Sequence, residues 1–462
     1  MGDVAKIFKA YDIRGVVPDE LDEDIAEAVG AAFVGVTGAR TVVTAHDMRT
    51  SSEPLAAAFA RGATGQGADV IEAGLASTDL LYYASGSLNV PGVMFTASHN
   101  PARYNGMKMC RAGARPIGRD TGLTEIRELV ERGVPAGRGP RGTVTRRDLL
   151  TGYAEHMHRL VDLSGIRPLK VAVDAGNGMA GYTVPAVLGR RPDGDGDAGG
   201  PAGPPIELVP LYFELDGTFP NHEANPIEPE NLRDLQAAVR SSGADIGLAF
   251  DGDADRCFVV DERGEIVSPS AITALVAVRE LARNPGAPIV HNLITSRAVP
   301  EIIAEHGGKP VRTRVGHSFI KQTMAETGAV FGGEHSAHYY FRDFWYADSG
   351  MLAALHVLAA LGEQDEPLSK LLAAYDRYPA SGEINSEVAD QAAATERVRA
   401  AFADRPGVTI DGLDGLTVST ADWWFNLRPS NTEPLLRLNA EATDERTMAA
   451  IRDEVLAIVR EK

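Results

Sequence analysis

The segment DIGLAFDGDADR (245–256) decides the fold, because an apolar run of strand length ends there in a dense polar turn. The same pattern recurs in GVMFTASHNP (92–101) and GAVFGGEHSAH (328–338). Short apolar runs bounded by glycine are typical of buried strands. In α/β sheets, ligands bind at the carboxyl ends of the strands. The three polar turns are therefore candidates for one functional site.

Each of these runs is the third in a repeated series. The first runs are RTVVTAHDMR (40–49), LKVAVDAGNGMA (169–180) and APIVHNLITSR (287–297), and the second runs are ADVIEAGLAST (68–78), PIELVPLYFELDG (205–217) and KPVRTRVGHSF (309–319). Helix-length stretches separate the runs, which indicates mainly parallel sheets. We predict three tandem related α/β domains, residues 1–150, 151–264 and 265–377. The alternative is that any α/β protein shows this rhythm.

The last part of the chain, residues 378–462, differs from the repeat. Strand-like segments GVTIDG, LTVSTADWWFNLRPS and LLRLNAEA lie between helix-like stretches, which predicts an α+β domain with an antiparallel sheet. The Gly-, Pro- and Asp-rich stretch 190–205 is expected to be a surface loop in the second domain.

The composition limits the class of protein. The chain has 462 residues, a net charge of −19 and two cysteines, Cys110 and Cys257. The acidic balance argues against nucleic acid as a partner. No apolar run reaches the length of a membrane span, and the N-terminus lacks a signal-peptide pattern. We expect a cytoplasmic protein with two buried thiols, and a monomer, with a dimer as the alternative.

The DGDADR turn is a candidate metal site. Asp251, Asp253 and Asp255 alternate at a strand end, so their carboxylates can converge on a hard cation such as Mg²⁺. An EF-hand loop is the main rival, but it requires glycine where Arg256 stands and a helix where the strand-like CFVV follows. A solvated acidic turn is the plain alternative.

The TASHNP turn presents Ser98 without a recognisable base. The sequence around it contains neither a GxSxG elbow nor a Ser-His-Asp pattern. A bare serine is a poor nucleophile, whereas a serine that already carries a phosphoryl group is a donor. His99 and Asn100 could then hydrogen-bond the phosphate. The alternative is an Asn-Pro turn with an incidental serine.

Two further motifs are suited to a sugar phosphate. RPSNTEP (428–434) offers a guanidinium, two hydroxyls and an amide in a proline-bounded loop, which can cradle an anion. In GEHSAH (333–338), Glu334, Ser336 and His338 would point the same way if the segment is extended. A carboxylate with a hydroxyl suits vicinal sugar hydroxyls, and His338 can move a proton near neutral pH. Ordinary turns and a polar strand edge are the alternatives.

In this order, the four motifs resemble the α-D-phosphohexomutase superfamily, and most of all its bacterial phosphomannomutase/phosphoglucomutase branch. The resemblance runs from KAYDIRG (9–15) to RPSNTEP. It implies four domains around one central cleft, each contributing one loop. It also implies a phosphoryl transfer between O1 and O6 of mannose, and also of glucose, through a phosphoserine and a hexose 1,6-bisphosphate. One Mg²⁺ per chain and the bisphosphate activator are the implied cofactors.

The resemblance also assigns roles to individual residues. The phosphoserine is Ser98, which binds the metal together with Asp251, Asp253 and Asp255. The implied catalytic group consists of Ser98, Arg14, Lys108, His99, Arg256 and His338. The implied substrate-binding group consists of Gly316, His317, Glu334, Ser336, His338, Arg428, Ser430, Asn431, Thr432 and Arg437.

Three positions depart from the family pattern or narrow the choice within it. Ala337 stands where relatives more often have glycine, and Ile294 stands where some place a lysine that contacts phosphate. His335 follows Glu334, whereas phosphoglucosamine mutases usually carry Gln there. A phosphoglucosamine mutase, a Mg²⁺-dependent sugar-phosphate phosphatase and a non-catalytic sugar-phosphate sensor remain the alternatives.

Overall fold

The computed structural model describes residues 4–137, 139–189, 203–430 and 435–461, without the side chains of residues 317 and 318. The chain divides into two compact units. Unit 1 consists of Met1–Pro269 and Ser336–Leu371, and unit 2 consists of Ser270–His335 and Leu372–Lys462. Among the described residues, no helix is long and apolar enough to cross a membrane.

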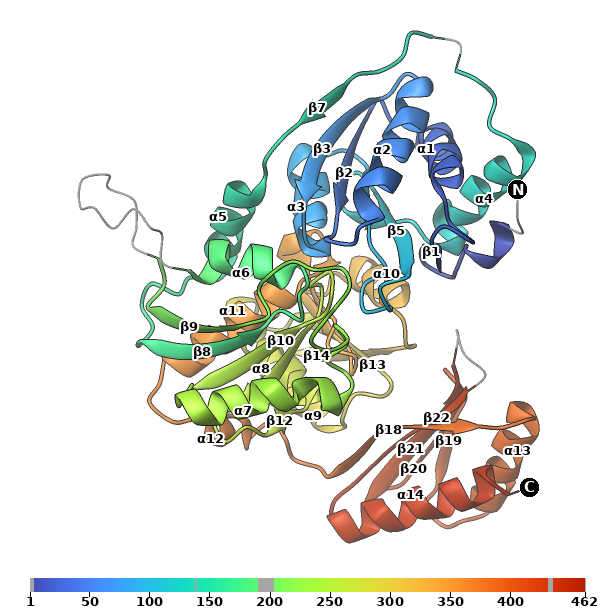
Figure 1. The fold of residues 1–462 in the computed structure, drawn as a ribbon. Coiled ribbons are helices and arrows are strands. Elements are labelled where there is room, and N and C mark those ends of the chain that lie inside the picture. Colours follow the sequence, from blue (N-terminus) through green and yellow to red (C-terminus); the bar gives the residue numbers. More distant parts are fainter. Residues whose placement is uncertain (1–3, 138, 190–202, 431–434, 462) are drawn as a thin grey trace. The chain divides into compact units, whose positions relative to one another are not determined.

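Unit 1 begins with a mixed sheet of order β1-β5-β4-β2-β3-β7, in which β6 pairs with β5. The strands are β1 (Ile13–Val16), β2 (Thr41–His46), β3 (Asp69–Leu75), β4 (Gly92–Phe95), β5 (Tyr104–Arg111), β6 (Arg115–Pro116) and β7 (Val144–Arg146). Helices α1 (Glu23–Thr37), α2 (Ser52–Gly65) and α4 (Leu123–Arg132) cover one face, and α3 (Thr78–Leu88) covers the other (Figure 1).

The second sheet of unit 1 has the order β12-β11-β10-β8-β9. Its strands are β8 (Leu169–Asp174), β9 (Ile206–Leu211), β10 (Ile246–Phe250), β11 (Cys257–Asp261) and β12 (Ile266–Val267). The unit also contains α5 (Leu150–Leu160), α6 (Ala180–Leu188), α7 (Arg233–Ser242), α11 (Gly350–Gly362) and the antiparallel pair β16 (Tyr339–Phe341) and β17 (Ala347–Asp348).

Unit 2 contains the parallel strands β14 (Lys309–Thr313), β13 (Pro288–Asn292) and β15 (Phe331–Gly333) with α8 (Pro269–Arg283), α9 (Ala298–Glu305) and α10 (His317–Thr327). Its C-terminal part is an antiparallel sheet of order β18-β22-β21-β20-β19. These elements are β18 (Ala380–Glu387), β19 (Thr409–Asp411), β20 (Leu416–Ser419), β21 (Trp423–Pro429) and β22 (Leu435–Ala442), with α13 (Gln391–Ala403) and α14 (Glu445–Val459) packed on one face (Figure 1). The short helix α12 (Leu368–Leu372) precedes them.

The predicted repeat is confirmed by the strand pairing. The first apolar runs form β2, β8 and β13, and each pairs in parallel with the second and third runs of its own series. The chain is thus three related α/β domains followed by an α+β domain, as the sequence predicted. Because the third runs are parallel to the first, their polar turns leave the carboxyl ends of the strands. The bounds of the four domains given above stay predictions.

Candidate active site

Ser98 lies in a strained turn at the end of β4. Its φ of 52° falls in the left-handed region, which costs free energy for a residue with a side chain and is held only where the surroundings impose it. The Ser98 amide donates to Thr96 Oγ1 at 2.9 Å, and the Asn100 amide donates to the Ala97 carbonyl at 3.0 Å. Ser98 is buried, so the turn fixes the hydroxyl at one place.

The DGDADR turn connects β10 to β11, which are antiparallel. The expected strand CFVV is therefore confirmed as part of β11, and the EF-hand alternative, which requires a helix there, is wrong. Ser98 Oγ donates to Asp251 Oδ2 at 2.8 Å. Two turns that are far apart in the sequence thus meet within unit 1, and each follows the third apolar run of its own series.

The three aspartates fit a hard divalent cation. Asp251, Asp253 and Asp255 are buried, and a ligand oxygen from each lies within 4.8 Å of the others. Among the described residues, Asp253 Oδ1 and Asp255 Oδ1 are buried without a hydrogen-bond partner. Buried carboxylate oxygens need a partner, and carboxylates in this number are the ligands that Mg²⁺ uses together with a phosphate oxygen.

Lys108, on β5, lies against this acidic cluster. Its Nζ is 2.6 Å from Asp253 Oδ2 and 2.5 Å from Asp255 Oδ2. Burial disfavours the charged form of Asp253, but Lys108 outweighs it and lowers the pKa of that carboxyl. Burial, and then the charge of Asp253, raise the pKa of Asp255. The carboxylates of Asp253 and Asp255 therefore repel each other, and a bound cation would reduce this repulsion.

His99 is held as a neutral acceptor. Arg256 Nη2 donates to His99 Nδ1 at 2.8 Å, and Ser98 Oγ lies 3.2 Å from the same nitrogen. Burial, and then Arg256 and Arg14, lower the pKa of His99 well below its usual value. A guanidinium can only donate, so His99 Nδ1 carries no proton and cannot protonate the serine.

Two arginines complete the cationic side of the Ser98 turn. Arg256 Nε donates to Asp251 Oδ2 at 3.0 Å. Arg14, on β1, donates to Asn100 Oδ1 at 2.5 Å and pairs with Asp12 at 2.8 Å. The structure thus brings the predicted residues Arg14, Ser98, His99, Lys108 and Arg256 together with the three aspartates in unit 1.

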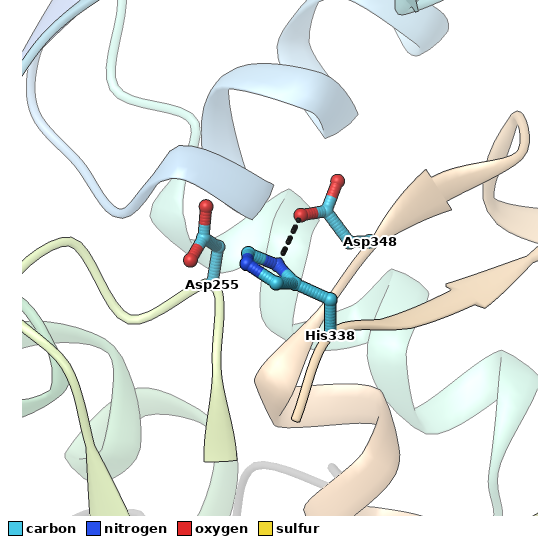
Figure 2. Close-up of side chains that lie close together, drawn as sticks. All are labelled: Asp255, His338 and Asp348. Carbon is cyan, nitrogen blue, oxygen red and sulfur yellow. Dashed lines mark hydrogen bonds and ion pairs between the residues drawn. The ribbon is translucent and has the colours of Figure 1, made fainter. Parts of the chain in front are cut away.

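His338 also belongs to unit 1, and its ring lies between two carboxylates (Figure 2). The Nδ1 atom is 3.0 Å from Asp348 Oδ2, and Asp348 is buried at the end of β17. Asp255 lies on the other side of the ring (Figure 2). A carboxylate at Nδ1 favours the tautomer with its proton there, which leaves Nε2 able to accept a proton.

The segment GEHSAH is a turn rather than an extended strand. Strand β15 ends at Gly333, and Ala337 has a φ of 63°. The premise that alternate residues of this segment point the same way is therefore wrong, because a left-handed residue interrupts the extended backbone. Because glycine adopts a positive φ without steric cost, glycine would fit position 337 better than alanine. Ser336 belongs to unit 1 and is partly exposed.

Glu334 lies at the end of β15 in unit 2, where its side chain is buried. Its Oε2 accepts from Asn292 Nδ2 at 3.2 Å and from the Gly316 amide at 3.4 Å. Gly316 has a φ of 132° and precedes α10. His317 is the first residue of α10, and its side chain lies outside the described residues. Glu334 and Gly316 are thus brought together as the resemblance implies.

Arg428 and Arg437 face each other across β21 and β22. Both reach Glu383 on β18, with N···O distances of 3.0 Å for Arg428 and 3.2 Å for Arg437. Burial lowers the pKa of Arg428 although Glu383 opposes this. Among the described residues, Arg428 Nε is buried without a hydrogen-bond partner. The Nε–H group of Arg428 can therefore donate to a further anion.

The remaining predicted residues are only partly described. Ser430 follows β21, and its amide donates to the Leu435 carbonyl at 2.8 Å. Asn431 and Thr432 lie outside the described residues. Ile294, which stands where some relatives place a lysine, packs with Leu293 and Trp424 in an apolar cluster. This position therefore supplies no cation.

Sequence reasoning missed several polar residues behind these turns. Thr78, at the start of α3, donates from Oγ1 to Asp253 Oδ2 at 2.6 Å and from its amide to the Asp253 carbonyl at 2.9 Å. Asp348, Glu383 and Arg49 were also not considered. Of these three residues, only Arg49 could have been suspected from the sequence, because it lies in the polar turn HDMR that follows the first apolar run.

Comparison with known proteins shows the family to which the chain belongs. The chain matches the family described as phosphoglucomutase/phosphomannomutase, with its alpha/beta/alpha domain I over residues 5–135, domain II over 151–264, domain III over 268–378 and the C-terminal domain over 383–458. It is 42% identical to a phosphomannomutase of Salmonella montevideo, with 98% of each chain covered. It is 41% identical to a protein of Xanthomonas campestris named phosphohexose mutases, with 97% and 98% covered.

A solved structure shows the same arrangement of elements. The X-ray structure of a phosphoglucomutase/phosphomannomutase family protein from Burkholderia thailandensis has a TM-score of 0.86 and 33% identity, and the match covers 98% of this chain and 97% of that one. The chain belongs to the phosphoglucomutase/phosphomannomutase family. It is an isomerase, an intramolecular phosphotransferase that acts on hexose phosphates.

Proposed function

We propose that the enzyme interconverts mannose 1-phosphate and mannose 6-phosphate, and likewise the two glucose phosphates, through a phosphoserine at Ser98 and a hexose 1,6-bisphosphate. The observation that carries the proposal is the hydrogen bond of 2.8 Å between Ser98 Oγ and Asp251 Oδ2, at the edge of a buried carboxylate triad. A hydroxyl held against metal-binding carboxylates and beside two cations suits phosphoryl transfer better than acyl transfer.

The first transfer moves the phosphoryl group from Ser98 to the sugar. The free O6 hydroxyl of mannose 1-phosphate attacks the phosphorus, so that a P–O6 bond forms while the P–Oγ bond breaks. His338 Nε2 takes the hydroxyl proton, while Asp348 holds the proton at Nδ1. Lys108 and Arg256 offset the negative charge on the transferring oxygens. Ser98 Oγ leaves with the electron pair and is then protonated.

The second transfer reverses these steps at the other end of the sugar. The bisphosphate turns over, Ser98 Oγ attacks the phosphorus on O1, and the P–O1 bond breaks. Oxygen O1 takes up a proton, and mannose 6-phosphate leaves. Across the cycle Ser98 regains its phosphoryl group, and no net proton is consumed. Hexose 1,6-bisphosphate can also restore a phosphoryl group that Ser98 has lost to water.

Asp251, Asp253 and Asp255, with an oxygen of the Ser98 phosphoryl group, would hold Mg²⁺. When bound, this ion withdraws charge from the group in transfer. The chain's own contribution is to keep these carboxylates buried and to hold Asp253 and Asp255 beside Lys108.

The substrate-binding roles fall mainly on unit 2. Glu334 is a hydrogen-bond acceptor of fixed position for sugar hydroxyls. The family resemblance assigns a contact with sugar hydroxyls to Ser336 as well. Arg428 and Arg437, with Ser430, Asn431 and Thr432, bind the phosphate that is not transferred. The buried Arg428 Nε, which has no hydrogen-bond partner among the described residues, supports this assignment.

A phosphorus NMR time course tests the proposal. Mannose 1-phosphate, Mg²⁺ and a trace of hexose 1,6-bisphosphate are mixed with the purified chain, and Ser98→Ala serves as the matched control. Mannose 6-phosphate is expected with the wild type and not with the variant. Inorganic phosphate in its place would identify a phosphatase. Turnover of glucosamine 6-phosphate alone would identify a phosphoglucosamine mutase. A competing run with glucose 1-phosphate ranks the two hexoses.

A further inference from the structure

Arg49 is buried beneath the Ser98 turn, and its guanidinium bonds the backbone of that turn. The residue follows β2, and its side chain is 1% exposed. The guanidinium donates to the carbonyl oxygens of Ser98 at 2.9 Å, Asn100 at 2.6 Å, Pro101 at 2.9 Å and Tyr104 at 3.0 Å. A single planar cation therefore gathers carbonyls from one end of the turn to the other.

These contacts set the shape of the turn. Carbonyl oxygens that point at one place repel each other, and each costs free energy if it is buried without a donor. The fork of donors on a guanidinium is rigid, so it fixes the carbonyls relative to one another. One of these carbonyls belongs to Ser98 itself, whose φ of 52° is unfavourable without such support.

Arg49 is itself held rigidly by its neighbours. Its Nε pairs with the buried Asp47 Oδ2 at 3.2 Å, and Ser52 Oγ donates to Asp47 Oδ1 at 2.5 Å. The ring of Phe219 lies 5.0 Å from the guanidinium carbon. A Cβ at Gly217 would lie 2.6 Å from Arg49 Cα, so this segment approaches as closely as a glycine permits.

We propose that Arg49 is a positioning residue for phosphoryl transfer, which acts through the Ser98 backbone. Among the described residues, its side chain contacts backbone carbonyls, Asp47 and Phe219, so it sets where Ser98 Oγ stands relative to Asp251 without binding sugar. The inference rests on the proposed phosphoserine function. It predicts an effect on the transfer step that is separate from substrate affinity, because a nucleophile displaced by about 1 Å loses on the order of 100-fold in rate.

The test is Arg49→Lys, which keeps the charge but loses the planar fork. Lysine has one nitrogen, which cannot reach carbonyls at both ends of the turn. The rate of Ser98 phosphorylation by glucose 1,6-bisphosphate is followed by intact mass, together with kcat and KM for mannose 1-phosphate. The phosphorylation rate and kcat are expected to fall on the order of 100-fold, while KM stays within about 3-fold of the wild type. Arg61→Lys, on the exposed face of α2, is the matched control and should match the wild type.

Phe219→Leu is a second, milder variant, which removes the ring that lies over the Arg49 guanidinium and so loosens its hold on the carbonyl oxygens. It is expected to lower kcat by about 3-fold without a change in KM, because only the ring over the guanidinium is lost. If circular dichroism shows that Arg49→Lys is unfolded, this variant decides the question, and a wild-type kcat would then overturn the inference.

The outcomes separate the two proposals. If the wild-type chain gains no phosphoryl group at Ser98, both the phosphoserine function and the role of Arg49 are wrong. If the wild-type chain is phosphorylated and a folded Arg49→Lys variant is phosphorylated at the same rate, only the role of Arg49 is wrong. A variant in which KM rises as much as kcat falls also overturns it, because a general loss of structure would do the same.

Discussion

The Ser98 turn and the arginine pair of the C-terminal domain solve opposite problems. Around Ser98, buried charges bind one another, and Lys108, Arg256 and Arg14 each already contact an acceptor. Around Arg428 and Arg437, both cations pair with Glu383, and the buried Arg428 Nε has no hydrogen-bond partner among the described residues. A site that transfers a group must be assembled beforehand, since its geometry sets the rate. A site that only binds an anion binds it more tightly if some of its hydrogen-bond donors are not already used within the protein.

The largest expected effect lies on the transfer side of this comparison. Ser98→Ala should lower mutase turnover by on the order of 10⁴-fold or more, because the residue that carries the phosphoryl group is removed. The fold should survive, since a small hydroxyl is lost and Asp251 keeps its bond from Arg256. A coupled mutase assay and circular dichroism check the two parts. Turnover at the wild-type level would contradict the phosphoserine role.

Arg428→Ala should change substrate affinity more than turnover. Loss of one charge-assisted contact to phosphate is expected to raise KM by about 10- to 100-fold, with a smaller fall in kcat. Steady-state kinetics with mannose 1-phosphate provide the measurement. Arg405→Ala is the control, because Arg405 pairs with Glu454 on the partly exposed surface of the same unit. An unchanged KM would place the bound phosphate elsewhere.

Thr78→Val tests whether the transfer side depends on groups behind the metal ligands. The variant removes the hydroxyl that donates to Asp253 Oδ2. We expect Mg²⁺ affinity, measured by titration calorimetry, to fall by about 10-fold, the lower end for the loss of a residue that orients a metal ligand. Thr78→Ser keeps the hydroxyl and should retain most of the affinity. Equal losses in both variants would indicate that packing, rather than the hydrogen bond, is responsible.

The smallest effect concerns stability. Burial raises the pKa of Asp79 to about 6, although Ser349, Ser77 and Tyr153 donate to it. The folded state thus binds this proton more tightly than the unfolded state, so the contribution of Asp79 to stability is lost as the pH rises from about 4 to 6. Relative to wild type, Asp79→Asn should show a weaker fall in the free energy of unfolding over this range, measured by urea titration. Parallel pH curves would contradict the assignment.

The sequence was sufficient for the repeat and for the turns that matter most. Apolar runs that end in polar turns predicted β4 and β10, and therefore the meeting of Ser98 with Asp251. It was insufficient wherever a contact depends on register or on distant segments. Arg428 faces Arg437 because β21 and β22 pair in one particular register, and Glu383 reaches both from a third strand. Ala337 turned left-handed where alternate spacing suggested an extended chain, since spacing carries no information on φ.

Both cysteines have a practical consequence. Cys110 and Cys257 are buried, and burial raises the pKa of the Cys257 thiol. Thiol reagents attack exposed thiolates, so we expect them to react slowly with Cys110 and Cys257 in the folded chain. A cysteine introduced on the surface can therefore be labelled selectively without first removing the natural ones.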